Sequence, residues 1–159
     1  MTFGQALHST FRENYATFSG RAPRSEYWFV TLFWILVTIG IVAVGAALYT
    51  ILEPVLPEEP GAIGGLLLIG IGLIVFVGVA IPMFALVVRR FHDVGLSGWW
   101  YFAPILVANV LAVMQPAIGN GLSSIVSIAV FVVTVWGSNA GPNKYGENPH
   151  AQTDVTTFE

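Results

Sequence analysis

The sequence contains no cysteine in its 159 residues, which excludes disulfide bonds, thiolate nucleophiles and cysteine-ligated metal sites. Charge is also scarce. Asp, Glu, Lys and Arg make up 9% of the chain, whereas about a quarter of the residues in a typical soluble domain are charged. Hydrophobic residues account for 55%, and the mean hydropathy is +0.76. This composition is not that of an ordinary soluble domain.

The few charges are confined to short segments, and three long runs contain no Asp, Glu, Lys or Arg. These runs extend from Tyr27 to Leu52, from Pro60 to Val88 and from Val94 to Asn143. A helix needs about 20 apolar residues to cross the roughly 30 Å hydrocarbon core of a bilayer. The first two runs each fit one such helix, and the third is long enough for a hairpin of two. The sequence therefore predicts a membrane protein with several spans.

The expected fold class is all-α, an integral membrane four-helix bundle that forms a single membrane domain over residues 1–149. The prolines of EPVLPEEPG cannot continue a helix and separate the first two spans, and PAIGNG (Pro116–Gly121) is expected to form the last turn. The polar tail 150–159 is expected to be disordered. The four spans are expected at about residues 28–52, 63–88, 99–115 and 122–137.

Pro82 lies inside the second span. Because proline has no N–H, it leaves the carbonyl of Gly78 without its helical partner, and we expect a kink rather than a break.

Aromatic and aliphatic residues recur before the first span at spacings of 4, 4, 4 and 3. This periodicity places them on one face of a short amphipathic helix. Such a helix either lies in the membrane interface with its aromatic face toward lipid or packs against the cytoplasmic ends of the bundle. The residues concerned are Phe3, Leu7, Phe11, Tyr15 and Phe18.

The four-span arrangement places every Lys and Arg on one side of the membrane. Loops rich in Lys and Arg stay in the cytoplasm, so both termini are expected there. Four of the five tryptophans fall at the same helix ends, where indole rings anchor at headgroup depth. The basic residues are Arg12, Arg21, Arg24, Arg89, Arg90 and Lys144, and the tryptophans are Trp28, Trp99, Trp100 and Trp136.

Three segments carry a family resemblance. GRAPRSEYW (Gly20–Trp28), RRFHDVGLSGWW (Arg89–Trp100) and GPNKYGENP (Gly141–Pro149) resemble the three signatures of the bacterial membrane family called domain of unknown function 805, or DUF805. The resemblance implies a small four-span protein of the bacterial cytoplasmic (inner) membrane. It implies no established activity, so no catalytic residue is carried over.

The segment RRFHDVGLSGWW is expected to be a cytoplasmic turn between two spans. Arg89 and Arg90 are either topology charges that reach lipid phosphate or ligands for an anionic headgroup, because guanidinium groups bind phosphate in a bidentate manner. His92 and Asp93 are adjacent, so on a helix they point about 100° apart and do not form a catalytic pair. A structural role for Asp93, such as pairing with an arginine, is favoured over acid–base chemistry.

Charged residues before span one and after span two are expected at the same membrane depth. Four guanidinium groups repel one another unless anions intervene. Glu26 and Asp93 supply two, which leaves about two positive charges for a phosphate or a partner's carboxylates. Two tryptophans would form the floor of such a site. The candidate anionic-ligand site comprises Arg21, Arg24, Glu26, Arg89, Arg90, His92, Asp93, Trp99 and Trp100.

Three function classes remain. A non-catalytic structural or interaction module with an anionic lipid or phosphate site comes first. An oligomeric channel or transport component is second, and a water-filled path lined by Asn109 and Gln115 would favour it. An interfacial enzyme using His92 and Asp93 is third, favoured by a cleft that joins His92 to Glu26. The expected partners are the bilayer, anionic phospholipid, and a second copy or another membrane protein. No catalytic residue, cofactor, metal or nucleic acid is assigned.

Reporter fusions test this topology. Fusions after Leu56, Gln115 and Glu159 should report outside, outside and inside, because the positive charges hold the opposite loops in the cytoplasm. A cytoplasmic signal from the fusion after Leu56 would contradict the orientation.

Overall fold

The computed structural model describes residues 1–52 and 62–149, and for residues 48–49, 52 and 62–77 it describes the backbone only. The glutamate-rich loop and the tail that was predicted to be disordered lie outside the described residues. Within the described ranges the chain is helical, with no strand, so the all-α prediction is confirmed. The elements are α1 (Phe3–His8), a π-helical turn η1 (Ser9–Glu13), α2 (Arg24–Leu52), α3 (Ala62–Asp93), α4 (Trp99–Met114) and α5 (Pro116–Val135).

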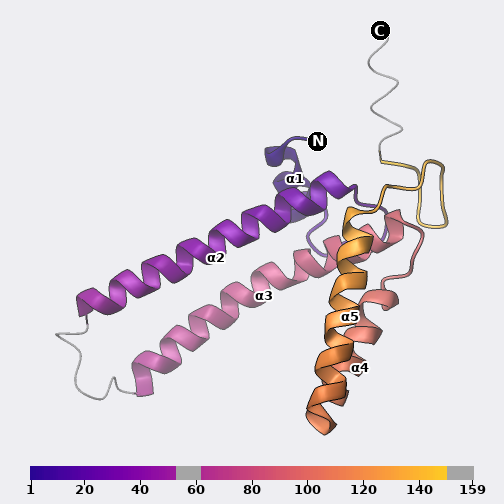
Figure 1. Cartoon of the computed structure of the whole chain (residues 1–159). Helices are drawn as coiled ribbons and strands as arrows, with labels where there is room; N and C mark the ends of the chain where they lie inside the picture. The colour runs from indigo at the N-terminus through magenta and orange to yellow at the C-terminus, as the bar shows by residue number, and fades with distance from the viewer. Residues whose placement is uncertain (53–61, 150–159) are drawn as a thin grey trace.

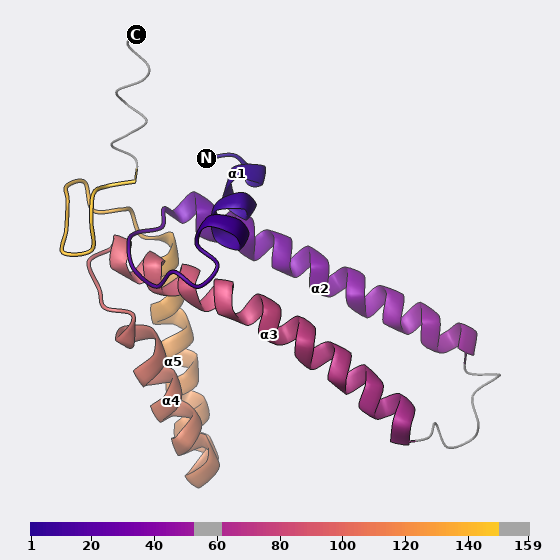
Figure 2. The same cartoon turned by 180° about the vertical axis from the view of Figure 1, so that it is seen from behind.

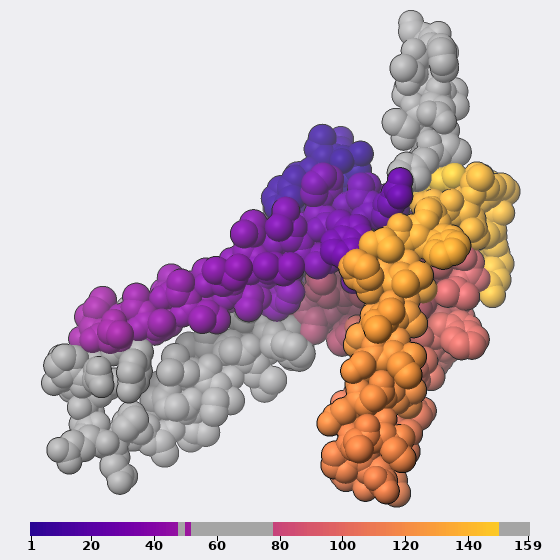
Figure 3. Space-filling model, viewed as in Figure 1, coloured from indigo at the N-terminus to yellow at the C-terminus, as the bar shows by residue number. Residues whose placement is uncertain are grey.

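The long helices form two pairs. Figures 1 and 2 show α2 beside α3 and α4 beside α5, with the two pairs diverging from one shared end. The space-filling view shows the same division, with α5 standing apart from α2 along most of its length (Figure 3). This differs from the closed four-helix bundle that the sequence predicts. Apolar helices in lipid gain no hydrophobic free energy from packing together, so an apolar pattern alone does not close a bundle.

Two of the described helical segments, Arg24–Ala47 and Pro116–Val135, are long and apolar enough to cross a membrane. The apolar helix α4 is shorter. This assessment rests on length and composition within the described residues.

The turn predicted over Pro116–Gly121 is wrong, because these residues form the first turns of α5 and only Gln115 separates it from α4. Proline is well suited to the first helical position, where its missing N–H would have no intrahelical partner. Within α5, Gly119 lies where α4 passes so close that there is no room for a side chain. A Cβ atom at Gly119 would lie 2.1 Å from the backbone nitrogen of Ala112.

The helix α3 continues to Asp93, so Arg89–Asp93 are helical. The prediction that the turn begins at Arg89 is therefore wrong. The helix ends in a Schellman motif. Leu96 N–H donates to the carbonyl of Phe91 (2.9 Å), and Gly95 N–H donates to that of His92 (3.0 Å). Gly95 has φ +85°, a left-handed conformation that glycine adopts without strain. The reversal toward α4 therefore occurs after Asp93.

The N-terminal helical segment ends at Glu13, so the predicted helical face does not extend to Tyr15 and Phe18. The segment packs on α2, with the Phe3 ring 5.9 Å from that of Phe29 and the Phe11 ring 5.8 Å from that of Phe33. The segment thus contacts the first turns of α2, and its position relative to a membrane stays a prediction.

Pro82 does not interrupt α3. The hydroxyl of Tyr15 donates to the carbonyl of Gly78 at 2.6 Å. This is the carbonyl that loses its helical partner to proline. The non-helical segment after η1 therefore compensates for the proline inside α3.

Substituting Gly119 tests the close packing of α4 and α5. We expect Gly119→Ala to lower the free energy of unfolding in detergent by about 1–3 kcal/mol, because the added methyl group overlaps the backbone of α4. Gly121→Ala is the matched control, since a Cβ atom there meets nothing within 4 Å. It should instead be neutral or stabilise by up to about 1 kcal/mol. Equal effects of the two variants in thermal unfolding would contradict the close approach.

Candidate functional site

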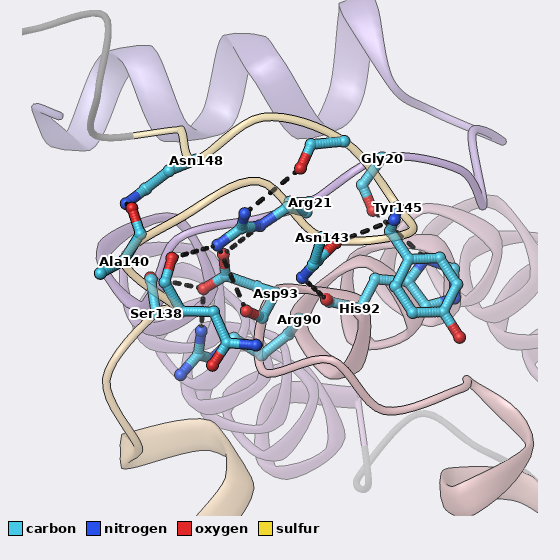
Figure 4. A network of polar contacts seen from close by, with 12 residues as sticks. Gly20, Arg21, Arg90, His92, Asp93, Ser138, Ala140, Asn143, Tyr145 and Asn148 are labelled. Atoms are coloured by element: carbon cyan, nitrogen blue, oxygen red, sulfur yellow. Dashed lines mark hydrogen bonds and ion pairs between the residues drawn. The ribbon is translucent and has the colours of Figure 1, made fainter.

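A buried carboxylate joins three segments at the shared end of the two helix pairs. Asp93, the last residue of α3, is fully buried and accepts a hydrogen bond from Arg21 Nε at 3.0 Å. Its second oxygen accepts from Arg90 Nη1 and from the hydroxyl of Ser138 (Figure 4). The segment before α2, the end of α3 and the loop after α5 therefore meet on one side chain.

Arg21 holds the loop 137–149 over this carboxylate. Its guanidinium donates to the backbone carbonyls of Asn139 at 2.7 Å, Gly141 at 2.9 Å and Gly146 at 3.3 Å. The segment GPNKYGENP, predicted only as a turn-rich loop, thus supplies carbonyl acceptors to a buried arginine. No side-chain pattern in the sequence indicates which carbonyls these are.

Arg90 lies at the C-terminal end of α5. It donates to the carbonyls of Val133 (3.2 Å) and Trp136, which belong to the last helical turn or follow it directly. These carbonyls lack intrahelical partners and carry the negative end of the helix dipole, so a cation is favourable there. Burial lowers the pKa of Arg90, whereas the neighbouring Asp93 raises it. Arg90 therefore connects the end of α3 to the end of α5, and it also pairs with Asp93 within α3.

A second ion pair ties the N-terminal segment to α2 and α3. Arg89 Nη2 lies 3.2 Å from Glu26 Oε1, and both side chains are buried. The same oxygen accepts hydrogen bonds from the hydroxyls of Ser9 and Thr10, each at 3.0 Å. Ser9 and Thr10 were not among the predicted site residues, because isolated hydroxyl side chains carry no distinguishing spacing.

His92 and Asp93 face different partners. The Nδ1 of His92 lies 3.2 Å from the carbonyl of Gly20, and its ring stacks on Tyr145 with 3.7 Å between ring centroids. Burial lowers the pKa of His92, the hydrogen bond to Gly20 opposes this shift, and Lys144 adds to it. A neutral ring that donates to Gly20 fits this environment. The two adjacent residues thus have separate partners, as expected for side chains that point about 100° apart on a helix.

The structure brings together six of the nine predicted site residues: Arg21, Glu26, Arg89, Arg90, His92 and Asp93. Arg24 is exposed at the start of α2. Trp99 and Trp100, expected as the floor, are 75% and 65% exposed on the first turn of α4. They line a separate apolar depression with Pro104 and Val107, so they do not form a floor beneath the ion pairs. Their place follows from the turn at Gly95, which separates α4 from the end of α3.

The buried ion pairs are unbalanced in charge. Arg21, Arg89 and Arg90 carry three positive charges, whereas Glu26 and Asp93 carry two negative ones. One positive charge therefore remains inside the cluster, and exposed Arg24 adds a second beside it.

These features define a small helical membrane protein whose helix pairs meet at a polar cap. The polar cap consists of the buried residues Arg21, Glu26, Arg89, Arg90, His92 and Asp93 and the cap loop 137–149. The chain belongs to the family described as "Protein of unknown function (DUF805)", whose family model matches residues 15–147. This confirms the resemblance read from the three sequence motifs. It is 31% identical over 140 residues to "Inner membrane protein YhaI" of Escherichia coli (strain K12), covering 86% of this chain and 89% of that protein.

A second relative, "Inner membrane protein YhaH" of the same organism, is 28% identical over 137 residues, covering 86% of this chain and 90% of the relative. No solved structure matches the chain.

The lowered pKa of His92 predicts a pH dependence of stability. The folded state favours the neutral ring, so its contribution is complete above the ordinary histidine pKa of about 6.5 and is lost as pH falls through the lowered value. The free energy of unfolding should therefore decrease on acidification below about pH 6.5. His92→Gln should lessen this decrease, and His8→Gln, at an exposed histidine, is the control. Identical pH profiles for the parent and His92→Gln would contradict the assignment.

Proposed function

We propose that this chain is a four-span inner-membrane protein, with both termini in the cytoplasm, that acts as a non-catalytic structural or interaction module. Its cytoplasmic face binds the phosphate of an anionic lipid headgroup or of a phosphorylated ligand. The inner-membrane names of its relatives and the position of the basic residues at the end where the helix pairs meet support this placement.

The observation that carries the proposal is the unbalanced positive charge of the cap. The surplus charge among the buried pairs lies beside exposed Arg24, and Arg24 acts electrostatically on Arg90. Basic side chains at the membrane surface attract anionic lipid by about 1 kcal/mol each. The cap therefore presents a positive potential at headgroup depth.

The contacts of His92 and Asp93 argue against the enzyme hypothesis. Asp93 is occupied by Arg21, Arg90 and Ser138, and the His92 ring is stacked on Tyr145. A polar cleft does reach Glu26, but His92 is not among the residues that line it. The described residues therefore do not form the cleft between His92 and Glu26 that would favour an enzyme.

An oligomeric channel or transport component is the second candidate. A cavity of about 490 Å³ lies between α2, α4 and α5, and its polar lining includes Asn109, Ser123 and Ser127. Gln115, the other residue expected on a pore, does not line this cavity. The lining is mostly apolar, and its few polar side chains are the feature that a second copy could extend into a path. Ion conductance by the purified protein in planar bilayers would favour the channel over the non-catalytic module.

Substitution of two exposed arginines distinguishes a local lipid-binding site from a general effect of surface charge. We expect Arg24→Gln to reduce the retention of phosphatidylglycerol over phosphatidylcholine about fivefold after purification, because it removes a cation beside the unbalanced cap. Arg12→Gln is the matched control, since Arg12 is also exposed but lies in η1. Equal losses of phosphatidylglycerol retention in both variants would mean that these arginines act only as topology charges, which would contradict the proposed site.

A further inference from the structure

A polar cavity of about 510 Å³ lies beside the second ion pair, at the N-terminal end of α2. Its lining includes Arg21, Ser25, Glu26 and Arg89, and the N-terminal segment and Ser19 close other sides. Ligand pockets in proteins typically enclose about 300–1,000 Å³. The cavity is therefore large enough for a phosphate group together with part of its organic substituent.

Two buried polar atoms on the cavity-lining residues have no hydrogen-bond partner among the described residues: the hydroxyl oxygen of Ser25 and the Nε of Arg89. Arg89 is only 3% exposed, and its Nη2 is used by Glu26. A buried donor without a partner costs about 1–3 kcal/mol, so such groups usually bind a ligand or ordered water. The Arg89 Nε can only donate and the Ser25 hydroxyl can donate, so an acceptor-rich ligand satisfies both.

The backbone adds to the same preference. The first four N–H groups of a helix lack intrahelical carbonyl partners, and they carry the positive end of the helix dipole. The Tyr27 N–H donates to the carbonyl of Pro23, which precedes α2. Ser25 and Glu26, which precede Tyr27 in the first turn, line the cavity. The helix has 29 residues, so its N-terminal end provides a substantial positive potential.

Glu26 is the acidic residue of the lining, and its charge is largely compensated. One of its oxygens accepts hydrogen bonds from Ser9, Thr10 and Arg89. Asp93 is shared by Arg21 and Arg90, so one positive charge of the cluster beside the cavity is left uncompensated. An anion in the cavity therefore meets a net positive surrounding.

On the strength of the proposed function, we infer that the Ser25–Arg89 cavity is the binding site for a phosphate group. The Ser25 hydroxyl and the Arg89 Nε donate to the phosphate oxygens, and Arg21 and the N-terminal end of α2 supply the field. The phosphate belongs either to an anionic lipid headgroup or to a soluble phosphate ester. This assigns the site to Ser25 and Arg89 and leaves Arg90, His92 and Asp93 to hold the cap together.

The test compares Ser25→Ala and Arg89→Lys with the full-length parent in zwitterionic detergent and in nanodiscs. Ser25→Ala removes only the free hydroxyl. Arg89→Lys keeps the charge near Glu26 but removes Nε. Ser97→Ala is the matched control, because Ser97 lies in the connection between α3 and α4, outside the cavity. One arm measures the rise of the unfolding temperature with inorganic phosphate against chloride at equal ionic strength. The other measures the preference for phosphatidylglycerol over phosphatidylcholine.

We expect Ser25→Ala and Arg89→Lys to weaken the response at least about fivefold, since hydrogen bonds to charged groups are strong, and Ser97→Ala to match the parent. A response in the phosphate arm identifies a soluble ester, and one confined to nanodiscs identifies a headgroup. Responses unchanged in folded Ser25→Ala would overturn the inference. If the preference for anionic lipid then still depends on Arg24, the proposed function stands and only the cavity assignment falls. If it depends on neither residue, both fall. Should Arg89→Lys not fold, Ser25→Leu replaces it: a lost response in the folded variant supports the site, and an unchanged response overturns it.

Discussion

The arrangement of this protein depends on the carboxylate of Asp93, which is shared by Arg21, Arg90 and Ser138. A buried charge costs several kcal/mol unless it is paired and hydrogen-bonded, so removing one partner strands the others. Helices in lipid have no hydrophobic drive toward one another. The polar cap therefore decides how the α2–α3 pair meets the α4–α5 pair, and the long helices diverge beyond it (Figures 1 and 4).

The same cap connects structure to the proposed activity. Arg90 and Asp93 are committed to helix ends and loop contacts, and His92 is committed to Gly20 and Tyr145. The Nε of both Arg89 and Arg90 lacks a partner among the described residues, but Arg89, which pairs with Glu26, lines the polar cavity at the N-terminal end of α2, and Arg90 does not. One cluster thus separates into residues that hold the fold and residues that are available to an anion. That division explains how adjacent arginines of the same motif come to have different roles.

The sequence predicted the helical class, the family and the convergence of Arg21, Glu26, Arg89, Arg90 and Asp93, because charge is rare in apolar helices and clusters at their ends. It did not predict that α5 begins at Pro116, since proline suits both a turn and the first helical position, and the glycines that follow it favour the turn. The exposed positions of Trp99 and Trp100 depend on the direction of α4 after Gly95, which local spacing does not determine. Backbone acceptors such as those of Asn139 and Gly141 have no sequence signal at all.

The absence of cysteine makes the central claim directly measurable, because spin labels attach only where cysteine is introduced. Val42 on α2 and Ile125 on α5 are both exposed. Spin labels on Val42→Cys and Ile125→Cys report the distance between the two helix pairs in nanodiscs by pulsed electron paramagnetic resonance. If Asp93 couples the pairs, Asp93→Asn should broaden or shift this distance distribution, whereas Glu147→Gln, at an exposed acid of the same cap loop, should leave it as in the parent. An unchanged, narrow distribution in Asp93→Asn would contradict the account.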